Sequence, residues 1–242
     1  MLLTVSIVAV LAVVQSLFGV GLLVFGTPTL LLLGYSFADA LAILLPASVT
    51  ISLLQVWKSG GQDVAFVRSF TGWCLVPLAV SLAAILLLDL HATLNIFVAI
   101  LLTVFVTLRL CQGVNEHARE WVAQHPRRWL LLMGAVHGVS NLGGALLLIF
   151  AASRFRRKED IRALVAFCYA CFAAMQLTIL AVVTPSVFGR SQVGYAGVAA
   201  IVFLLVGQRV FRWVSAPAFD WLLTLVAGAY AGLLGLRSAG VL

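Results

Sequence analysis

The sequence predicts an all-α polytopic membrane protein built from two homologous halves. Its composition, its charge-free runs and a weak internal repeat together support this fold class. Of the 242 residues, 63% are hydrophobic and 10% are charged, and the mean hydropathy is +1.15. Soluble domains are about 45–50% apolar and about 25% charged. Much of this apolar surface must therefore face lipid.

Long runs without Asp, Glu, Lys or Arg recur along the chain. Each run is close to the roughly 20 residues that an α-helix needs to cross the hydrocarbon of a bilayer. The first run and the run after the middle of the chain are interrupted by glycines. The predicted helical segments are 2–33 (interrupted), 37–56, 67–88, 92–110, 129–152 (interrupted), 160–183, 192–210 and 217–236.

Weak matches at a near-constant offset of 121–122 residues indicate the two halves. Such self-similarity is the sequence signature of a duplicated unit. We expect a first transmembrane repeat at 1–110, a cytoplasmic connecting loop at 111–128 and a second transmembrane repeat at 129–242. The matched pairs are Gln15 with His137, Gly19 with Asn141, Gly21 with Gly143, Asp39 with Asp160, Ser48 with Tyr169, and Gln55 with Gln176.

The distribution of Lys and Arg favours inverted repeats. If all eight segments crossed the membrane, eight basic residues would lie on one side and seven on the other. If the first segment of each half is instead a re-entrant hairpin followed by three crossings, the numbers become thirteen and two. This bias satisfies the positive-inside rule, and it places both termini outside the cell (inner) membrane. A single kinked crossing helix is the alternative to each hairpin.

Broken helices in inverted repeats are typical of secondary transporters. We expect the two broken-helix tips to meet near the middle of the membrane and to form one site for alternating access. A helix that restarts after a glycine-rich break offers free amide groups and the positive end of its dipole to an anion. No Lys, Arg, Asp or Glu lies at mid-depth in a predicted span, so the pattern favours a small anion or a neutral solute. The candidate substrate-binding residues are Gln15, Ser16, Gly19, Gly21, Ser48, Thr50, Gln55, His137, Ser140, Asn141, Gly143, Gly144, Tyr169 and Gln176.

His137 is the candidate for proton coupling. Apart from Cys and Tyr, it is the one ionisable side chain deep in a predicted span, and free histidine titrates near neutral pH. The alternative is a neutral imidazole that hydrogen bonds to a neighbouring helix, as the matched Gln15 would do. No second ligand lies at helical spacing from His137, so we expect neither a metal nor another cofactor.

Two other features have competing interpretations. Cys168 and Cys171 could form a transmembrane thiol–disulfide relay, but the matched positions are Ala47 and Thr50, so simple helix packing is the alternative. A non-transporting membrane scaffold is a third hypothesis. The basic cluster "RFRRKEDIR" at 154–162 is expected to orient the chain near anionic headgroups, and an entry funnel for anions is its alternative. Since the net charge of +7 lies in short loops, no nucleic-acid partner is expected.

Two stretches resemble a known family. "FGVGLLVFGTPTLLLLGYSFADALAILLPASVTISLLQ" (18–55) and "GAVHGVSNLGGALL" (134–147) resemble the two motif copies of the TauE/SafE membrane transporters, also called the 4-toluene sulfonate uptake permease family. The resemblance implies a permease for sulfite, organosulfonates or small carboxylates, and not an enzyme. Its partners would be the anion, protons and the bilayer, with a homodimer as an open alternative to a monomer. His137 and Asn141 replace the small residues that are more usual in the second motif.

Overall fold

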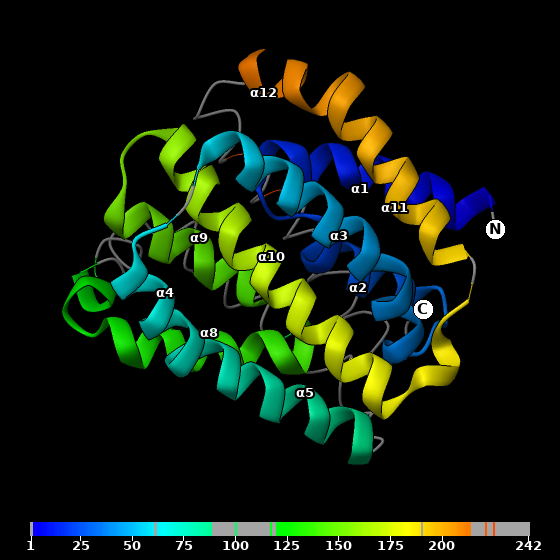
Figure 1. Ribbon diagram of the computed structural model, residues 1–242, viewed down its shortest axis with the longest axis horizontal. Helices are drawn as coiled ribbons and strands as arrows, with labels where there is room; N and C mark the ends of the chain where they lie inside the picture. The colour runs from blue at the N-terminus through cyan, green and yellow to red at the C-terminus, as the bar shows by residue number, and fades with distance from the viewer. Residues whose placement is uncertain are drawn as a thin grey trace.

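The computed structural model describes residues 2–60, 62–88, 100, 117, 120–189, 191–213, 221 and 225, and every regular element in this part is a helix (Figure 1). The predicted segments 92–110 and 217–236 lie outside the described residues, apart from three single positions. The elements are α1 Leu2–Phe18, α2 Leu22–Leu32, α3 Phe37–Ser59, α4 Val64–Phe70, the π-helical turn η1 Thr71–Leu75, α5 Val76–Leu88, α8 Pro126–Ser140, α9 Gly143–Arg154, α10 Lys158–Val183, the 3-10 turn η2 Pro185–Val187, α11 Ser191–Val202, the π-helical turn η3 Phe203–Gly207 and α12 Gln208–Trp213.

Four described helices are long and apolar enough to cross a bilayer. They are α3, the continuous helix Val64–Leu88, α10 and the continuous helix Ser191–Trp213. The remaining apolar helices α1, α2 and α9 are shorter, with 10–17 residues. The interrupted segments of the sequence thus correspond to pairs of short helices. The second pair begins at Pro126, before the expected start at 129, because proline suits the first position of a helix.

The two helix breaks have similar backbone geometry. α1 is followed by Gly19 with φ 73°, and α8 is followed by Asn141 with φ 63°. Glycine and asparagine tolerate this left-handed region better than other residues. Two positions later, Gly21 and Gly143 lie so close to the preceding helix that an added Cβ would press on the backbone N of Gln15 or collide with the side chain of His137. At each break a short helix therefore packs back against the one before it.

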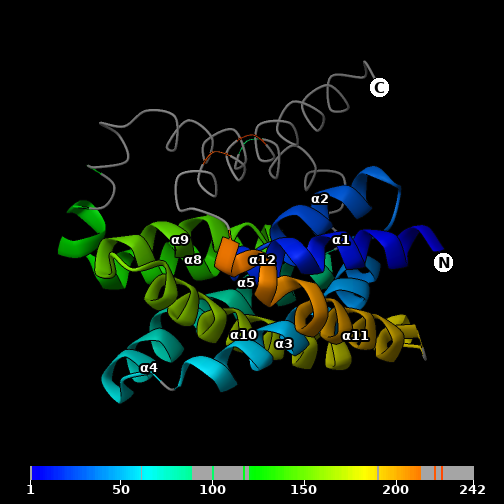
Figure 2. The same ribbon diagram turned by 90° about the horizontal axis from the view of Figure 1, so that it is seen from above.

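The long helices of the two halves are interleaved. α3 and α10 pack against each other along the centre of the molecule, as Figures 1 and 2 show. α5, from the first half, packs against α8 and α10 of the second half. α11, from the second half, packs against α1 and α3 of the first half. α5 therefore covers α8 of the second broken pair, and α11 covers α1 of the first.

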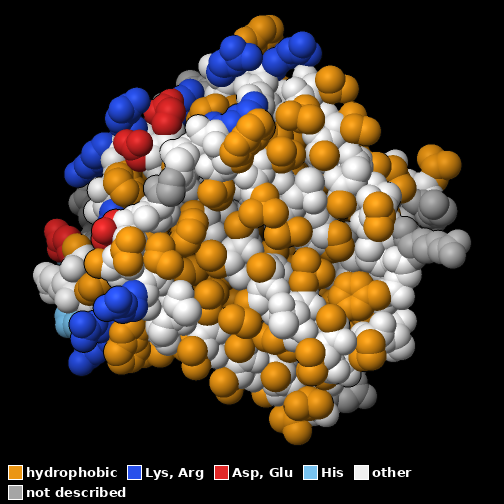
Figure 3. All heavy atoms as spheres, in the orientation of Figure 1, with side chains coloured by type: hydrophobic (Ala, Val, Ile, Leu, Met, Phe, Trp, Pro, Cys, Tyr) orange, Lys and Arg blue, Asp and Glu red, His pale blue; other side chains and the backbone are white. Residues whose placement is uncertain are grey.

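The surface divides into an apolar face and a charged edge. Large apolar side chains such as Leu87, Val182 and Val193 are 70%, 76% and 78% exposed. Figure 3 shows hydrophobic side chains over much of the molecule, with Lys and Arg gathered along the edge near α12, α4 and the connection between α9 and α10. An apolar surface of this extent is stable in contact with lipid. The chain is a multi-pass membrane protein.

Two glycines allow α8 to approach the first half closely. A Cβ at Gly134 would collide with the carbonyl of Cys74, and one at Gly138 would collide with the carbonyl of Leu78 and the hydroxyl of Ser81. Small residues four positions apart let membrane helices come into backbone contact. This pair therefore holds α8 against η1 and α5.

We expect Gly138→Ala to lower the free energy of unfolding by about 1–3 kcal/mol, because the new methyl group overpacks this contact. Gly197→Ala is the matched control, since a Cβ at Gly197 in α11 has no neighbouring atom within 4 Å. Thermal unfolding in detergent should show a lower midpoint for Gly138→Ala only. Equal midpoints for the two variants would contradict the close-contact explanation.

Candidate functional site

The sequence-predicted site residues form two polar clusters, one beside each helix break. The first-break cluster consists of Gln15, Ser16, Ser48, Ser52 and Gln55, from α1 and α3. The second-break cluster consists of Thr27, His137, Asn141, Tyr169 and Gln176, from α2, α8, α10 and the break itself. All ten side chains are buried, with exposed fractions of 0–2%.

The first-break cluster is largely closed by its own hydrogen bonds. The Gln15 amide Nε2 lies 3.1 Å from the Ser48 hydroxyl and 3.2 Å from the Ser52 hydroxyl. The backbone N–H of Leu22 donates to Gln15 Oε1 at 3.2 Å, which secures the start of α2. Gln55 Nε2 donates to the carbonyl of Ser16 at 3.1 Å, near the end of α1. This cluster ties both arms of the first break to α3.

The second-break cluster joins the two halves. Gln176 Nε2 on α10 donates to Asn141 Oδ1 at 2.6 Å, and Asn141 Nδ2 donates to the hydroxyl of Thr27 on α2 at 2.8 Å. The His137 ring stacks on Phe172 with a centroid distance of 4.2 Å and meets the Tyr169 ring edge-on at 5.8 Å. The imidazole is therefore fixed by aromatic contacts.

Four buried polar atoms in this cluster have no hydrogen-bond partner among the described residues. They are both ring nitrogens of His137, the hydroxyl of Tyr169 and Oε1 of Gln176. The Gln176 side chain is near the imidazole, but its geometry does not satisfy a hydrogen bond. Each unpaired buried group costs about 1–3 kcal/mol, so several together indicate that a polar ligand or water completes the site.

The backbone lies close to these open atoms. A Cβ at Gly144 would collide with the hydroxyl of Tyr169, and one at Gly143 would collide with the side chain of His137. Ser140, in contrast, donates its hydroxyl to the carbonyl of Val136 at 2.7 Å. Its oxygen also accepts from the backbone N–H of Leu142 at 3.3 Å. The two glycines make room for the Tyr169 and His137 side chains themselves, whereas Ser140 satisfies the backbone of the break.

Two other predicted residues also bond to the backbone of their own helix. Thr50 donates to the carbonyl of Pro46 at 2.7 Å, is half-buried and belongs to neither cluster. The hydroxyl of Ser16 donates to the carbonyl of Ala12 at 2.6 Å, so Ser16 contributes only its carbonyl to the first-break cluster.

Each matched set of residues comes together within its own half. Gln15 contacts Ser48, and Gln55 binds the carbonyl of Gln15 at 3.3 Å. At the equivalent positions, His137 lies against Tyr169 and near Gln176. The first set leaves one buried polar atom without a partner among the described residues, Gln55 Oε1, whereas the second set leaves four.

The two breaks lie at different levels along α10 and do not meet at one point. Gly19 is next to Val165 and Arg162, near the start of α10. Asn141 binds Gln176, near its end. At 1.5 Å per residue, the levels of Arg162 and Gln176 differ by roughly 20 Å. The two broken helix pairs contact each other through α2, which packs against α9 where Gly144 lies beside Val24 and which accepts the Asn141 hydrogen bond at Thr27. The expected meeting of the two tips is therefore wrong.

Several site residues were missed by the sequence interpretation. Ser52 follows Ser48 by one helical turn, and that spacing could have identified it. Thr27 has no comparable signal, because its partner Asn141 is 114 positions away in the chain. Cys74, from the first half, is close enough to Cys168 to interact electrostatically, so the predicted thiol pair has a cysteine neighbour. Cys74, Cys168 and Cys171 are all free thiols.

Comparison with known proteins identifies the family of the chain. A family model described as "Sulfite exporter TauE/SafE" matches residues 4–235 of the 242. No curated protein and no solved structure gives a significant match. The matched range contains both helix breaks and both polar clusters, and the family is one of transporters and not of enzymes. The chain belongs to the TauE/SafE sulfite exporter family.

Proposed function

We propose that the protein is a proton-coupled secondary transporter of small anions in the cell (inner) membrane. Sulfite, organosulfonates and small carboxylates are the substrate classes. Membership of the sulfite exporter family supports transport of sulfite or a related anion. The observation that carries the proposal is the set of four unpartnered polar atoms on His137, Tyr169 and Gln176.

The chemistry of the second-break cluster suits an anion. A tyrosine hydroxyl and an imidazole N–H are donors that an oxyanion can accept from. The buried polar side chains of the described residues are Thr4, Gln15, Ser16, Thr27, Ser48, Ser52, Gln55, His137, Ser140, Asn141 and Gln176. Since none of these is a carboxylate, no negative charge among them would repel the substrate.

His137 would couple anion binding to a proton. A protonated imidazole has two N–H donors and a positive charge, so it binds an anion more strongly than the neutral ring does. By linkage, a bound anion then favours protonation to the same extent. Gln15, at the equivalent position of the first half, cannot titrate, so this role belongs to one half only.

Inverted repeats would supply the alternating access. The interleaved packing of α5 and α11 and the similar breaks at Gly19 and Asn141 support two related halves. We infer six crossings, of which 92–110 and 217–236 are two, with both termini outside and both breaks re-entrant. Rocking of the first broken pair against the second, across the contact of α2 with α9, would expose the site to each side in turn.

The site is tested by Tyr169→Phe in a ligand-stabilisation assay. The variant should lose most of the rise in unfolding midpoint that sulfite, methanesulfonate or acetate gives the wild type. At a ligand concentration of 100 Kd that stabilisation is about 2.7 kcal/mol. Without ligand, Tyr169→Phe should be as stable as the wild type or more so, because it removes an unpaired buried hydroxyl.

Tyr195→Phe is the matched control for that experiment, because the buried Tyr195 hydroxyl donates to the Thr4 hydroxyl at 3.3 Å. It should lose stability without ligand and keep the full ligand response. Flux of labelled sulfite in proteoliposomes is the companion measurement. If the wild type neither binds nor transports any of these anions, the proposed function is wrong.

We expect His137→Gln to bind the anion and to flatten the pH dependence of transport, since glutamine keeps hydrogen-bonding groups but cannot take a proton. Initial rates of sulfite flux between pH 5.5 and 8.5 measure this. The wild-type rate should change by about tenfold or more across the range, as expected for one titrating group. An unaltered profile in the variant would exclude His137 from coupling.

The re-entrant topology places Lys58, Glu120 and Arg157 on one side of the membrane. Single cysteines at these positions, with the four native cysteines replaced by alanine, should all react with an impermeant maleimide from the cytoplasmic side. A cysteine at Ser191 should react from the opposite side. Labelling of positions 120 and 157 from different sides would instead favour two kinked helices that cross fully.

A further inference from the structure

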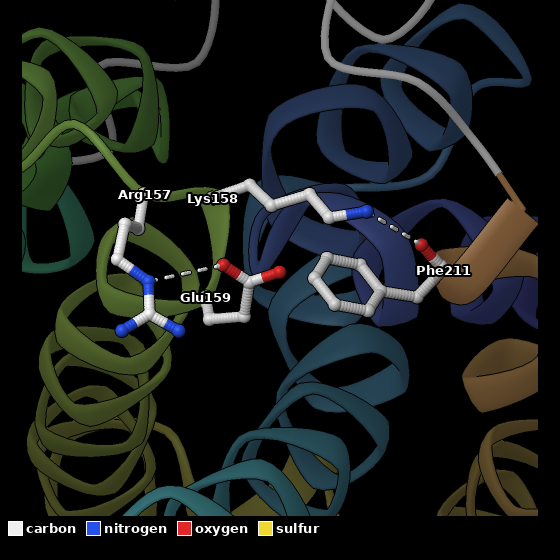
Figure 4. A network of polar contacts seen from close by, with 4 residues as sticks. All are labelled: Arg157, Lys158, Glu159 and Phe211. Atoms are coloured by element: carbon white, nitrogen blue, oxygen red, sulfur yellow. Dashed lines mark hydrogen bonds and ion pairs between the residues drawn. The ribbon is translucent and has the colours of Figure 1, made fainter.

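Two cations at the start of α10 hold α12 in place. Lys158 Nζ lies 3.5 Å from the carbonyl oxygen of Phe211, within hydrogen-bond distance, and 4.9 Å from the centre of its ring (Figure 4). The guanidinium of Arg162, one turn further along, lies 3.4 Å from the same ring centre. Arg157, in contrast, points to Glu159 at 3.9 Å and is largely exposed. Within the basic cluster, Lys158 and Arg162 thus face the protein.

Arg162 also reaches the first helix break. Its Nη1 lies 3.5 Å from the carbonyl oxygen of Ser16, the same oxygen that accepts from Gln55. Its own carbonyl is beside Gly19. Arg162 therefore meets this break through both its backbone and its guanidinium.

One donor of Arg162 is left open. Its Nε is buried and has no hydrogen-bond partner among the described residues. Glu159 is close enough to interact electrostatically, but it forms its ion pair with Arg157. A guanidinium that only capped the end of α1 would not require this buried free donor. The missing partner is an acceptor. Gln55 Oε1 is an unpaired buried acceptor at the same break. It is neutral, and beside a cation the most favourable acceptor is an anionic oxygen.

The matched position of the first half carries no cation. The position that matches Arg162 in the first half is Leu41, which is fully buried in α3. The cation is therefore specific to the end of the molecule where Lys and Arg gather, which the proposed topology places in the cytoplasm.

We propose that Arg162 is an oxyanion-binding residue beside the first break, at the end of the molecule that the proposed topology places in the cytoplasm. We call this the inner-mouth site, and it is separate from the second-break cluster. Phe211 holds the guanidinium of Arg162 in place until an anion binds. The inference rests on the proposed function, because Arg162 would give the transported anion a first binding site on the cytoplasmic side of the protein. A sulfite or sulfonate oxygen would accept from Nε and from a terminal N–H in the paired geometry that arginine offers. The protein then binds the anion more tightly from the cytoplasmic face of the membrane than from the outer face.

The test is sided transport of labelled sulfite in inverted and right-side-out membrane vesicles. Arg162→Gln should raise the half-saturating sulfite concentration at the cytoplasmic face by about tenfold or more, the effect of one lost charge-assisted pair. At the outer face the change should be less than about twofold. Arg162→Lys, which keeps the charge but loses the paired donors, should give an intermediate value.

Arg156→Gln is the matched control, because it removes an exposed positive charge from the same cluster. It should leave both faces within about twofold of the wild type. An equal rise at both faces for Arg162→Gln, or the same effect from Arg156→Gln, would overturn the inner-mouth site. Absence of sulfite transport by the wild type would overturn the proposed function itself. If Arg162→Gln does not fold, Arg162→Lys and Phe211→Leu supply the sided comparison.

Discussion

The whole arrangement depends on satisfying the backbone where two helices stop inside a membrane protein. Hydrocarbon offers no hydrogen bonds, so a broken helix persists only where protein groups or a water-filled cavity receive its free amides and carbonyls. Gln15 does this at the first break, where its side-chain oxygen accepts from the N–H of Leu22. Ser140 does it at the second break for Leu142. The polar residues around each break are first of all a requirement of the backbone.

The two breaks differ in how many of their buried polar atoms have hydrogen-bond partners. At the first break, Gln15, Ser48 and Ser52 satisfy one another. At the second, His137 and Tyr169 replace Gln15 and Ser48, and their polar atoms find no acceptor or donor in the described part of the chain. The second break leaves four buried polar atoms without a partner in this part of the chain, and the first leaves two, Gln55 Oε1 and Arg162 Nε.

The sequence was sufficient for those features that depend on local pattern. Charge-free runs predicted the long helices, because crossing hydrocarbon requires a fixed length of apolar chain. Gly19, Gly21 and Gly143 predicted the breaks, because few other residues accept such backbone conformations and contacts. The equivalence of the two halves stays a prediction, but Gln15, Ser48 and Gln55 lie together, and so do His137, Tyr169 and Gln176.

Features that depend on distant contacts were not predictable. Nothing around Thr27 indicates that it binds Asn141, and the two breaks lie at different levels along α10 although their sequences align. Arg162 was grouped with its exposed neighbours, because a run of basic residues does not reveal which of them turn inward. The packing of Phe211 from α12 distinguishes Lys158 and Arg162 from the exposed Arg156 and Arg157.

The exchange of helices between the halves has a consequence for biosynthesis. α1 obtains its neighbour α11 only after most of the chain has been made, and α8 packs on α5, which was inserted long before it. During translation, the first broken pair must therefore wait in the bilayer without Gly207 and Arg162, which lie beside Ser16 in the finished protein. A chain that stalls after the first half would leave this end of α1 uncovered. Quality-control proteases of the membrane could then recognise such an incomplete product by the same residues that the finished protein keeps buried.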